Sequence, residues 1–252
     1  MPFSPPEHMS MLLLPLSKIY GGAVNMRNWG YSSDIVKAKH LPKPVISVGN
    51  ITVGGTGKTP VTRFLSELLN QSNQQVAILT RGYGRIARET IILNRENLSE
   101  VPFSRTGDEP RLLARSLKNG AVFIDPDRRR AGELALSTLN PDVFVLDDGF
   151  QHRGLNRDLD IVTIDAAKPF GNGRLLPSGP LREPVDQLKR ADLLWITRVN
   201  ESGLSIDQIR SQLRQFMEKP MVFSQHEATY LLRPIDQSRF PVGEIEGKRV
   251  VA

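Results

Sequence analysis

The chain has 252 residues, of which 39% are hydrophobic and 24% are charged, and this length and composition fit one globular domain with at most a small additional lobe. It contains no cysteine, which excludes disulfide bonds and thiolate metal sites and favours a reducing compartment, and its four histidines lack the spacing of zinc ligands. Lys and Arg outnumber Asp and Glu by 33 to 27, and the net charge of +6 favours an anionic partner such as phosphate, nucleic acid or an acidic membrane surface.

The first predicted element is a short apolar helix near the N-terminus. The run from Met9 to Leu16 is shorter than the roughly 18 apolar residues that cross a bilayer. Glu7 and His8 precede it in place of the positive charges of a signal peptide, so secretion is a poor fit. The helix can pack against a core or lie in a membrane interface beside Lys18 and Arg27, and the residues alone favour neither arrangement.

From Pro44 onward, short apolar runs alternate with helical segments. Val45–Val48 is typical of a buried strand, and Lys58–Asn70 is typical of a helix because its apolar residues recur every three or four positions. Further strands are predicted at Val76–Thr80, Ala121–Ile124, Val143–Leu146, Ile161–Ile164, Leu193–Thr197 and Met221–Phe223, and further helices at Pro110–Leu117, Arg128–Leu139, Asp186–Arg190 and Ile206–Phe216. This alternation predicts an α/β fold: a mostly parallel sheet with helices on both faces and ligands at the carboxyl ends of its strands.

A glycine-rich loop follows the first predicted strand. Its residues are Thr52, Val53, Gly54, Gly55, Thr56, Gly57, Lys58 and Thr59. The end of the loop matches the P-loop pattern, although Thr52 stands where that pattern has its first glycine. The glycines allow backbone N–H groups to turn toward phosphates, Lys58 can reach the β- and γ-phosphates, and the Thr59 hydroxyl can bind Mg²⁺. The loop therefore predicts a P-loop nucleotide site that takes ATP and Mg²⁺.

An acidic strand end supports this prediction. Four apolar residues, Val143–Leu146, lead directly into Asp147 and Asp148. An aspartate at the end of a buried strand is where P-loop enzymes hold Mg²⁺, directly or through water. We therefore expect Asp147 and Asp148 to serve the metal together with Thr59.

Several sequence blocks together resemble the tetraacyldisaccharide 4′-kinase family, the lipid A 4′-kinases. The blocks are Leu14–Ser17 with Tyr20–Gly21, Pro44–Pro60, Thr80–Gly84, Gly107–Pro110, Leu146–Arg153, Leu175–Pro177 and Gly179–Glu183. They occur in this order over almost the whole chain, and Thr52 at the first loop position is itself similar to the family pattern. The resemblance is therefore much more specific than a P-loop alone.

This resemblance implies transfer of the γ-phosphoryl group of ATP, with Mg²⁺, to the 4′-hydroxyl of a tetraacylated glucosamine disaccharide 1-phosphate. The product is lipid IVA, in lipid A (lipopolysaccharide) biosynthesis. The family works at the cytoplasmic face of the bacterial inner membrane and attaches to this anionic surface through an N-terminal helix. We therefore expect an interfacial helix and connection in residues 1–40 and a P-loop kinase domain in residues 41–252. We also expect a sequence that is incomplete at its C-terminus, since members of the family continue with an Asp-His-His type segment.

The resemblance also assigns roles to individual residues. It implies that Asp108 accepts the proton of the attacking hydroxyl, whereas spacing alone favours Asp108 as the N-cap of the helix that begins near Pro110. Lys58, Asp147 and Asp148 complete the expected catalytic group. The expected substrate contacts are Arg81, Tyr83, Glu109, Arg128, Gln151, His152, Arg182 and Glu183.

Two other functions fit parts of the sequence. A P-loop GTPase or ATPase switch for assembly or metal insertion would share the loop and the Asp147 strand, but it would not explain Arg81–Gly84 or Arg182 and Glu183. A nucleic-acid binder would place aromatic residues among its basic ones, and aromatic residues make up only 6% of this chain. We therefore expect no nucleic-acid partner, and we expect a monomer that binds an acylated disaccharide phosphate and an anionic membrane surface.

Overall fold

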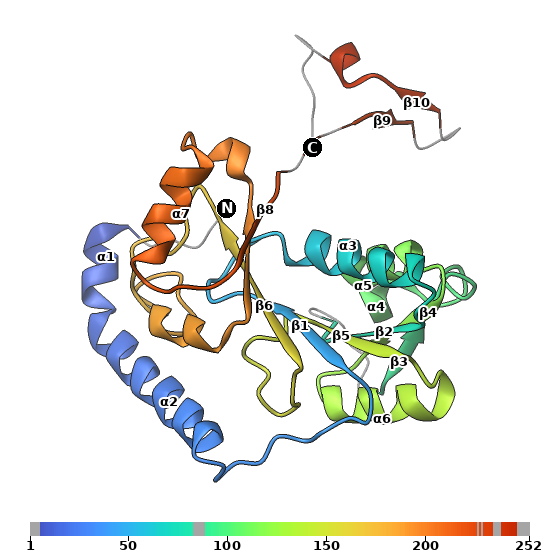
Figure 1. Cartoon of the computed structure of the whole chain (residues 1–252), viewed down its shortest axis with the longest axis horizontal. Coiled ribbons are helices and arrows are strands. Elements are labelled where there is room, and N and C mark those ends of the chain that lie inside the picture. Colours follow the sequence, from blue (N-terminus) through green and yellow to red (C-terminus); the bar gives the residue numbers. More distant parts are fainter. Residues whose placement is uncertain (1–5, 83–88, 226, 228, 234–237, 246–252) are drawn as a thin grey trace.

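The computed structural model describes residues 6–82, 89–225, 227, 229–233 and 238–245, and its main feature is one large sheet (Figure 1). The strands of this sheet are β1 (Val45–Gly49), β2 (Val76–Thr80), β3 (Ile91–Leu93), β4 (Gly120–Ile124), β5 (Val143–Asp147), β6 (Leu159–Asp165), β7 (Leu193–Thr197) and β8 (Met221–Phe223). They lie in the order β3-β4-β2-β5-β1-β6-β7-β8. Every pairing is parallel except that of β3 with β4.

Helices cover both faces of the sheet (Figure 1). The helices and helical turns of the main body after β1 are α3 (Lys58–Gln71), α4 (Phe103–Thr106), α5 (Asp108–Ser116), α6 (Arg128–Thr138), η1 (Val185–Arg190), η2 (Val199–Glu201) and α7 (Ile206–Arg214). The buried residues Val61 of α3 and Leu113 of α5 pack on one face, while Ala131 and Ala135 of α6 pack on the other. The predicted α/β fold with a mostly parallel sheet is therefore confirmed.

The strand predictions agree closely with the structure. Val76–Thr80, Leu193–Thr197 and Met221–Phe223 are confirmed to the residue. The segment at 185–190 is a 3-10 helix instead of an α-helix. Strand β3 has only three residues and pairs antiparallel at the edge of the sheet, so it lacks the long apolar run by which the central strands were recognised.

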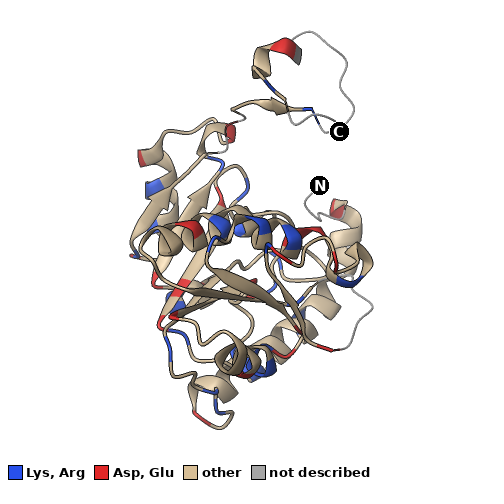
Figure 2. Cartoon of the chain, turned by 90° about the vertical axis from the view of Figure 1, so that its right-hand side faces the viewer, with Lys and Arg blue, Asp and Glu red and all other residues tan. Residues whose placement is uncertain are grey.

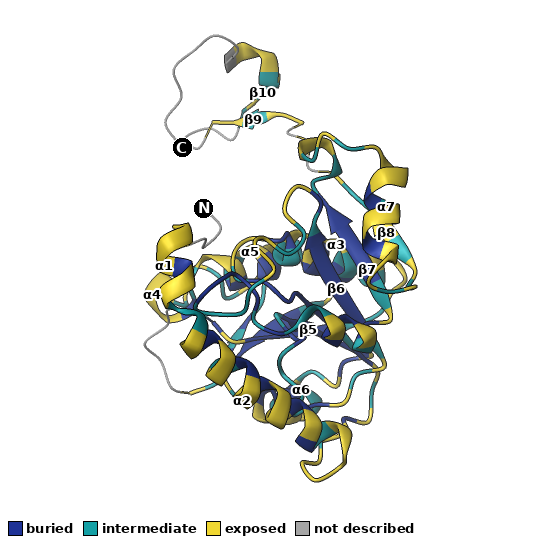
Figure 3. Ribbon diagram, turned by 90° about the vertical axis from the view of Figure 1, so that its left-hand side faces the viewer, coloured by how far each residue is buried: buried dark blue, intermediate teal, exposed yellow. Residues whose placement is uncertain are grey.

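The N-terminal helical region is longer than predicted and has an unusual distribution of buried residues. It consists of α1 (Glu7–Leu12) and α2 (Leu14–Ser32), which lie along one side of the molecule (Figure 3). The buried residues of α2 are Ser17, Gly21, Val24, Asn28 and Gly30. Its large apolar residues point outward, with Ile19 and Met26 each 70% exposed and Trp29 62% exposed. The face toward the protein is thus small and polar, the reverse of a core-packing helix.

No helix among the described residues combines the length and the apolar character needed to cross a bilayer. After β8, β9 (Leu231–Leu232) and β10 (Arg239–Phe240) form a separate antiparallel pair, followed by η3 (Val242–Ile245). This C-terminal element stands apart from the large sheet in Figure 1.

Candidate functional site

The candidate site lies at the carboxyl ends of the central strands, where a parallel sheet positions ligands. The phosphate loop connects β1 to α3, Asp147 ends β5, and Thr80 ends β2. Two adjoining cavities open here. The nucleotide cavity, of about 640 Å³, is lined by residues 54–60 of the loop, and the acceptor cavity, of about 460 Å³, lies beside it. Thr80, Gly82, Glu109, Asp147, Asp148 and Arg182 line both.

The phosphate loop has the backbone that its glycines predict. Gly54 and Gly57 have φ angles of 108° and 80°, in the left-handed region where a side chain is disfavoured. Gly57 is the N-cap of α3 and provides no side-chain cap, so the first N–H groups of the helix are left to a ligand. By contrast, Thr52 forms an antiparallel bridge with Leu181, an extended conformation that suits a β-branched residue. This bridge is the physical reason that Thr52 can replace the first glycine of the common pattern.

Polar contacts to neighbouring strands hold the middle of the loop. Asn50 donates to the Thr56 hydroxyl at 2.9 Å, and the Thr197 hydroxyl donates to the Thr56 carbonyl at 3.0 Å. Arg198 donates to the Gly55 carbonyl at 2.5 Å from the end of β7. The loop is thus fixed before any nucleotide binds, which lowers the entropy that binding must remove.

Asp147 is buried at the end of β5, with 4% of its surface exposed. It accepts hydrogen bonds from Thr62 at 3.3 Å and Thr80 at 3.0 Å. Burial, followed by the negative charge of Asp148, raises the pKa of Asp147 to about 6. A cation bound nearby would therefore strongly stabilise the ionised form of this carboxylate.

Asp148 adopts a left-handed backbone with φ of 53° and is held by two cations. Arg182 contacts its carboxylate at 3.0 Å, and the Lys58 ammonium lies 3.5 Å away. Burial tends to raise the pKa of Asp148, but the charges of Lys58 and Arg182 outweigh it and hold this pKa below its ordinary value. The two adjacent carboxyl groups therefore differ in pKa because only one of them is paired with cations.

The donor atoms at this strand end fit Mg²⁺. Asp147 and Asp148 line the nucleotide cavity together with Thr59, so two carboxylates and one hydroxyl face the same space. Across the described segments, no group of three or more His, Cys, Asp or Glu side chains is arranged to hold a metal without other ligands. Mg²⁺ in kinases is typically held by one or two carboxylates together with substrate phosphates, so this small oxygen set suits it.

Asp108 and Glu109 begin α5 beside the phosphate loop. Gly107 is the N-cap of this helix, so Asp108 is not the cap that its spacing alone favoured. Its side chain instead accepts from the Glu109 N–H at 3.0 Å, and Asp108 lines the nucleotide cavity as an exposed residue. Glu109 lines both cavities. Asp108 is therefore exposed to the nucleotide cavity, next to a residue that lines both cavities.

The acceptor cavity gathers most of the predicted substrate contacts. They are Arg81, Glu109, Arg128, Gln151, His152 and Arg182, and Tyr83 lies outside the described residues. Arg128 is 4% exposed, and burial lowers its pKa to about 10, so it remains a cation at neutral pH. Burial and then the charge of Arg128 lower the pKa of His152 to about 4, which keeps this imidazole neutral. Its buried Nε2 has no hydrogen-bond partner in the described structure.

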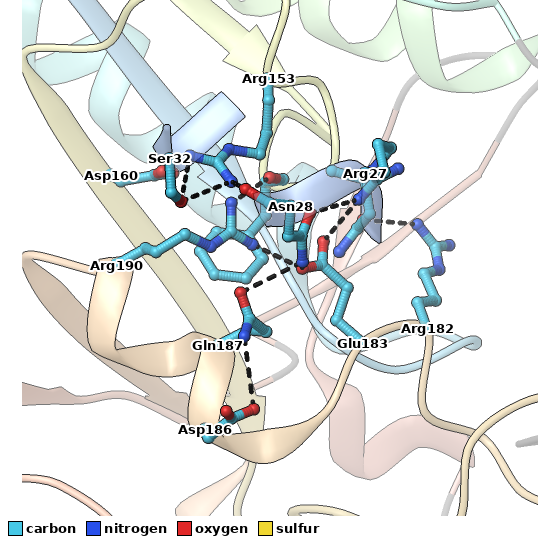
Figure 4. A network of polar contacts seen from close by, with 12 residues as sticks. Arg27, Asn28, Ser32, Arg153, Asp160, Arg182, Glu183, Asp186, Gln187 and Arg190 are labelled. Atoms are coloured by element: carbon cyan, nitrogen blue, oxygen red, sulfur yellow. Dashed lines mark hydrogen bonds and ion pairs between the residues drawn. The ribbon is translucent and has the colours of Figure 1, made fainter. Parts of the chain in front are cut away.

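Glu183, which was predicted to contact substrate, lines neither cavity. Its side chain is completely buried and points toward α2, as Figure 4 shows. It accepts from Arg190 at 2.7 Å, from Asn28 at 2.8 Å and from Arg27 at 3.3 Å. Because a buried carboxylate must be paired, Glu183 joins the N-terminal helix to the segment that carries Arg182.

Several cavity residues were absent from the predicted site, among them Tyr20, Arg27 and Arg198. Tyr20 and Arg27 of α2 line the acceptor cavity, and Arg198 lines the nucleotide cavity. The spacing of Tyr20, Arg27 and Asn28 places polar side chains on one face of an otherwise apolar helix, a pattern that the sequence contains. For Arg198, only its place directly after a buried strand could have indicated the cavity.

Comparison with known proteins identifies the family. The sequence pattern of the family described as tetraacyldisaccharide-1-P 4′-kinase matches residues 9–252. A tetraacyldisaccharide 4′-kinase of Anaeromyxobacter dehalogenans is 38% identical over 92% of this chain and 62% of its own length. The protein of the same name in Geobacter sulfurreducens is 45% identical over 75% of this chain and 54% of its own length. The chain thus spans between half and two thirds of these two relatives.

The fold agrees with a solved structure. The chain superposes with a TM-score of 0.79 and 38% identity on the crystal structure of LpxK from Aquifex aeolicus in complex with ATP. The match covers 96% of this chain and 72% of that one. The same arrangement of strands and helices therefore exists in a protein that was crystallised with ATP.

The ion pairs of Glu183 predict a large loss of stability on neutralisation. Glu183→Gln removes a buried negative charge and leaves Arg190 without its partner, so the free energy of unfolding should fall by about 2–4 kcal/mol. Urea denaturation measures this change. The control is Glu67→Gln, whose ion pair with Arg63 is well exposed and should contribute less than about 0.5 kcal/mol. Equal denaturation midpoints for the two variants would contradict this account.

Because the pKa of Asp147 is raised, neutralising this side chain should stabilise the fold by an amount that depends on pH. Above pH about 6 the buried carboxylate is ionised and destabilises the fold, and below about 4 the group is protonated in both folded and unfolded chains. Asp147→Asn should therefore raise the free energy of unfolding by about 1–3 kcal/mol at pH 8, with the gain disappearing as the pH falls to about 4. Thermal unfolding without nucleotide or metal tests this expectation. A gain of the same size at pH 4 and pH 8 would show that ionisation is not its cause.

Proposed function

The chain belongs to the tetraacyldisaccharide-1-P 4′-kinase family, and on this premise we propose that it transfers the γ-phosphoryl group of ATP to the 4′-hydroxyl of a tetraacylated glucosamine disaccharide 1-phosphate. The product would be lipid IVA in lipid A biosynthesis. One observation carries the proposal for this chain. The nucleotide cavity and the acceptor cavity adjoin and share lining residues, among them Asp147, Asp148 and Arg182, so a phosphoryl group can pass directly from one to the other.

The residues of the nucleotide cavity are suited to the charge of the transferred group. Lys58 lies in the first turn of α3, next to the uncapped N–H groups that bind phosphate oxygens. Arg182 lines the same cavity and contacts Asp148 at 3.0 Å. We expect Arg182 to shift part of its contact from Asp148 to the γ-phosphoryl oxygens as charge develops there. Preorganised cations of this kind lower the barrier because they need no reorganisation during the reaction.

The acceptor hydroxyl needs a group that takes its proton. Asp108 lines the nucleotide cavity close to the shared wall, and its exposed carboxylate can accept the proton as the oxygen bonds to the γ-phosphorus and ADP leaves. Asp147, Asp148 and Thr59 would hold Mg²⁺, which, when bound there, neutralises charge on the β- and γ-phosphate oxygens. The neutral His152 and Gln151 are suited to hydrogen bonds with sugar hydroxyls.

The outward apolar face of α1 and α2 supports attachment to a membrane. Leu12 is 79% exposed, and the exposed residues Ile19, Met26 and Trp29 follow on α2. The inward face is fixed by hydrogen bonds, including one from Ser17 to the Leu175 carbonyl at 2.9 Å. Such a helix is suited to lie in the interface of an anionic bilayer, with its apolar side among the acyl chains. We propose that the protein is a monomer that binds the cytoplasmic face of the inner membrane in this way, where its acceptor resides.

Removing the loop lysine tests the kinase reaction. Lys58→Ala should lower turnover by about two to four orders of magnitude, because it removes charge neutralisation from the transition state. The measurement is transfer of ³²P from ATP to the disaccharide lipid in mixed micelles. ATP consumption with and without the lipid is measured in parallel. A rate of ATP hydrolysis that does not depend on the lipid would favour the alternative function of a P-loop switch. A wild-type rate of transfer in Lys58→Ala would show that this loop does not take part in the mechanism.

Charges on the exposed face of α2 test the membrane attachment. The double variant Ile19→Glu, Met26→Glu should fold normally, since both side chains are 70% exposed, but should lose binding to vesicles that contain anionic lipid. Flotation of the protein with these vesicles measures the effect. Ile206→Glu provides a control, because Ile206 is 46% exposed on α7, away from this face. If the double variant floats with the vesicles as well as wild type does, the exposed face of α2 is not the membrane-binding surface.

A further inference from the structure

Arg198, which directly follows β7, joins the phosphate loop to the end of β6. One terminal nitrogen of its guanidinium donates to the Gly55 carbonyl at 2.5 Å, and the other donates to the Asp165 carboxylate at 2.6 Å. Asp165 is the last residue of β6, and its second oxygen accepts from the Ala167 N–H at 3.0 Å, so this carboxylate is itself fixed. One ion pair therefore holds the phosphate loop against the ends of two strands.

Arg198 and the preceding Thr197 together hold two successive carbonyls of the loop. The Thr197 hydroxyl donates to the Thr56 carbonyl at 3.0 Å, next to the Gly55 carbonyl that Arg198 holds. The peptide bonds that follow these carbonyls are trans, and in a planar trans peptide the C=O and the next N–H point in opposite directions. Because both carbonyls are held toward the end of β7, the N–H groups of Thr56 and Gly57 are directed away from it.

The two N–H groups directed in this way are available to a ligand. Thr56 and Gly57 are buried, and within the described part of the chain no group accepts a hydrogen bond from either N–H. Both residues line the nucleotide cavity. Buried N–H groups are seldom left without an acceptor, and successive N–H groups in a turn commonly form an anion site. The oxygens of a phosphate chain are therefore suitable acceptors for this part of the loop.

The backbone of Arg198 is strained. Its φ of 54° and ψ of 39° lie in the left-handed region, which is unfavourable for a residue with a long side chain. Glycine or asparagine would adopt the same backbone with less strain. The arginine instead supplies a half-buried guanidinium between Gly55 and Asp165. A strained residue whose side chain makes a specific contact at a ligand site indicates a functional role.

Positive charge alone does not distinguish Arg198. The chain has 33 Lys and Arg residues, and Figure 2 shows them interspersed with Asp and Glu on the helices. Arg198 differs because its charge is already paired with Asp165 while a second nitrogen holds a loop carbonyl. Lys58 and Arg182 both contact Asp148, which lines the nucleotide and acceptor cavities alike.

We propose that Arg198, held by Asp165, is a positioning residue that fixes the Gly55 carbonyl so that the next two N–H groups of the loop face the phosphate chain of ATP. The inference rests on the proposed function, because it takes ATP as the ligand of this loop. Arg198 acts through the loop backbone and needs no contact with the base or with the phosphates. Its contribution therefore depends on the phosphate chain and is the same with or without a nucleoside.

The first experiment removes the guanidinium and preserves the backbone. Arg198→Asn is suitable because asparagine tolerates the left-handed conformation and carries no charge. The whole chain is titrated in a calorimeter with inorganic tripolyphosphate and with ATP, both without Mg²⁺. We expect Kd to rise by about 10-fold for both ligands, the size expected when hydrogen bonds to a charged ligand lose their alignment. A loss for ATP alone would show that Arg198 contacts the nucleoside, and this result would overturn the proposal.

The second variant, Asp165→Asn, distinguishes positioning from direct contact with the phosphates. It removes the charge that holds the guanidinium and leaves Arg198 in place, while the amide oxygen can still accept from the Ala167 N–H. We expect Kd for tripolyphosphate to rise by about 10-fold again, and the double variant to lose no more than either single variant, because the two residues act as a unit. If the guanidinium itself bound phosphate, its release from Asp165 would lower Kd. An unchanged or lower Kd in Asp165→Asn would therefore contradict the positioning role.

The control uses the ion pair of Arg210 with Asp207 on α7. Its length of 2.7 Å is close to that of the Arg198 pair, and neither residue lines the nucleotide cavity. Arg210→Asn and Asp207→Asn make the same changes in charge and should leave Kd for tripolyphosphate unchanged. Equal losses in these variants would mean that net charge is the cause. Should Arg198→Asn prove unstable in thermal unfolding, Asp165→Asn provides the same test with the backbone of residue 198 unaltered.

Turnover separates this inference from the proposed kinase reaction. With the disaccharide lipid as acceptor, Arg198→Asn should raise KM for ATP by about 10-fold and leave KM for the lipid within about twofold, since the loop holds the phosphates alike before and during transfer. An equal rise in both KM values would indicate a general loss of structure and would overturn the positioning role.

The two proposals can fail independently. Tripolyphosphate binding that is weakened in both variants, without any transfer to the lipid by wild type, would contradict the kinase reaction and leave the positioning role standing. Transfer to the lipid, together with a Kd for tripolyphosphate that neither variant alters, would do the reverse. A chain that binds neither tripolyphosphate nor ATP would contradict both.

Discussion

The position of Arg182 is the constraint on which the rest of the site depends. Its N–H donates to the Ile51 carbonyl at 2.7 Å, just before the phosphate loop, and its carbonyl accepts from Tyr20 of α2 at 2.9 Å. Its guanidinium meets Asp148 at 3.0 Å. One residue therefore fixes the phosphate loop, the acidic end of β5 and the N-terminal helix relative to one another, and the buried Glu183 that follows holds it there.

The site concentrates groups that destabilise the fold. Asp147 is buried with a pKa raised to about 6, His152 is buried with a pKa lowered to about 4, and Asp148 has a left-handed backbone. Each of these features opposes folding when considered alone. They persist because the apolar sides of the central strands are covered by helices on both faces, so the strand ends are rigid supports. A loss of stability of this kind is typical of sites that hold charged groups in place for binding and catalysis.

The sequence allowed most of the sheet and the phosphate loop to be predicted, because both depend on local chemistry. Central parallel strands are short β-branched runs, and the loop needs glycines and a lysine at fixed positions. The orientation of Glu183 was not predictable in this way. It depends on Asn28, which is 155 residues away in the chain. The three residues of β3 were missed because an edge strand this short has no distinctive pattern, and the inward face of α2 was missed because its contacts are tertiary.

Helix α2, whose large apolar side chains point outward, sets a distance that matters for the proposed reaction. Its inner side touches the segment that carries Arg182 and its outer side is apolar, so one helix diameter, about 10–12 Å, separates the phosphoryl-transfer site from the hydrocarbon boundary. A disaccharide headgroup is about as thick as that gap. In the membrane-bound arrangement proposed above, the acceptor sugar can therefore reach the site while its acyl chains remain in the bilayer. In that arrangement the protein would not need to extract its lipid from the bilayer, because diffusion along the membrane surface would bring the two together.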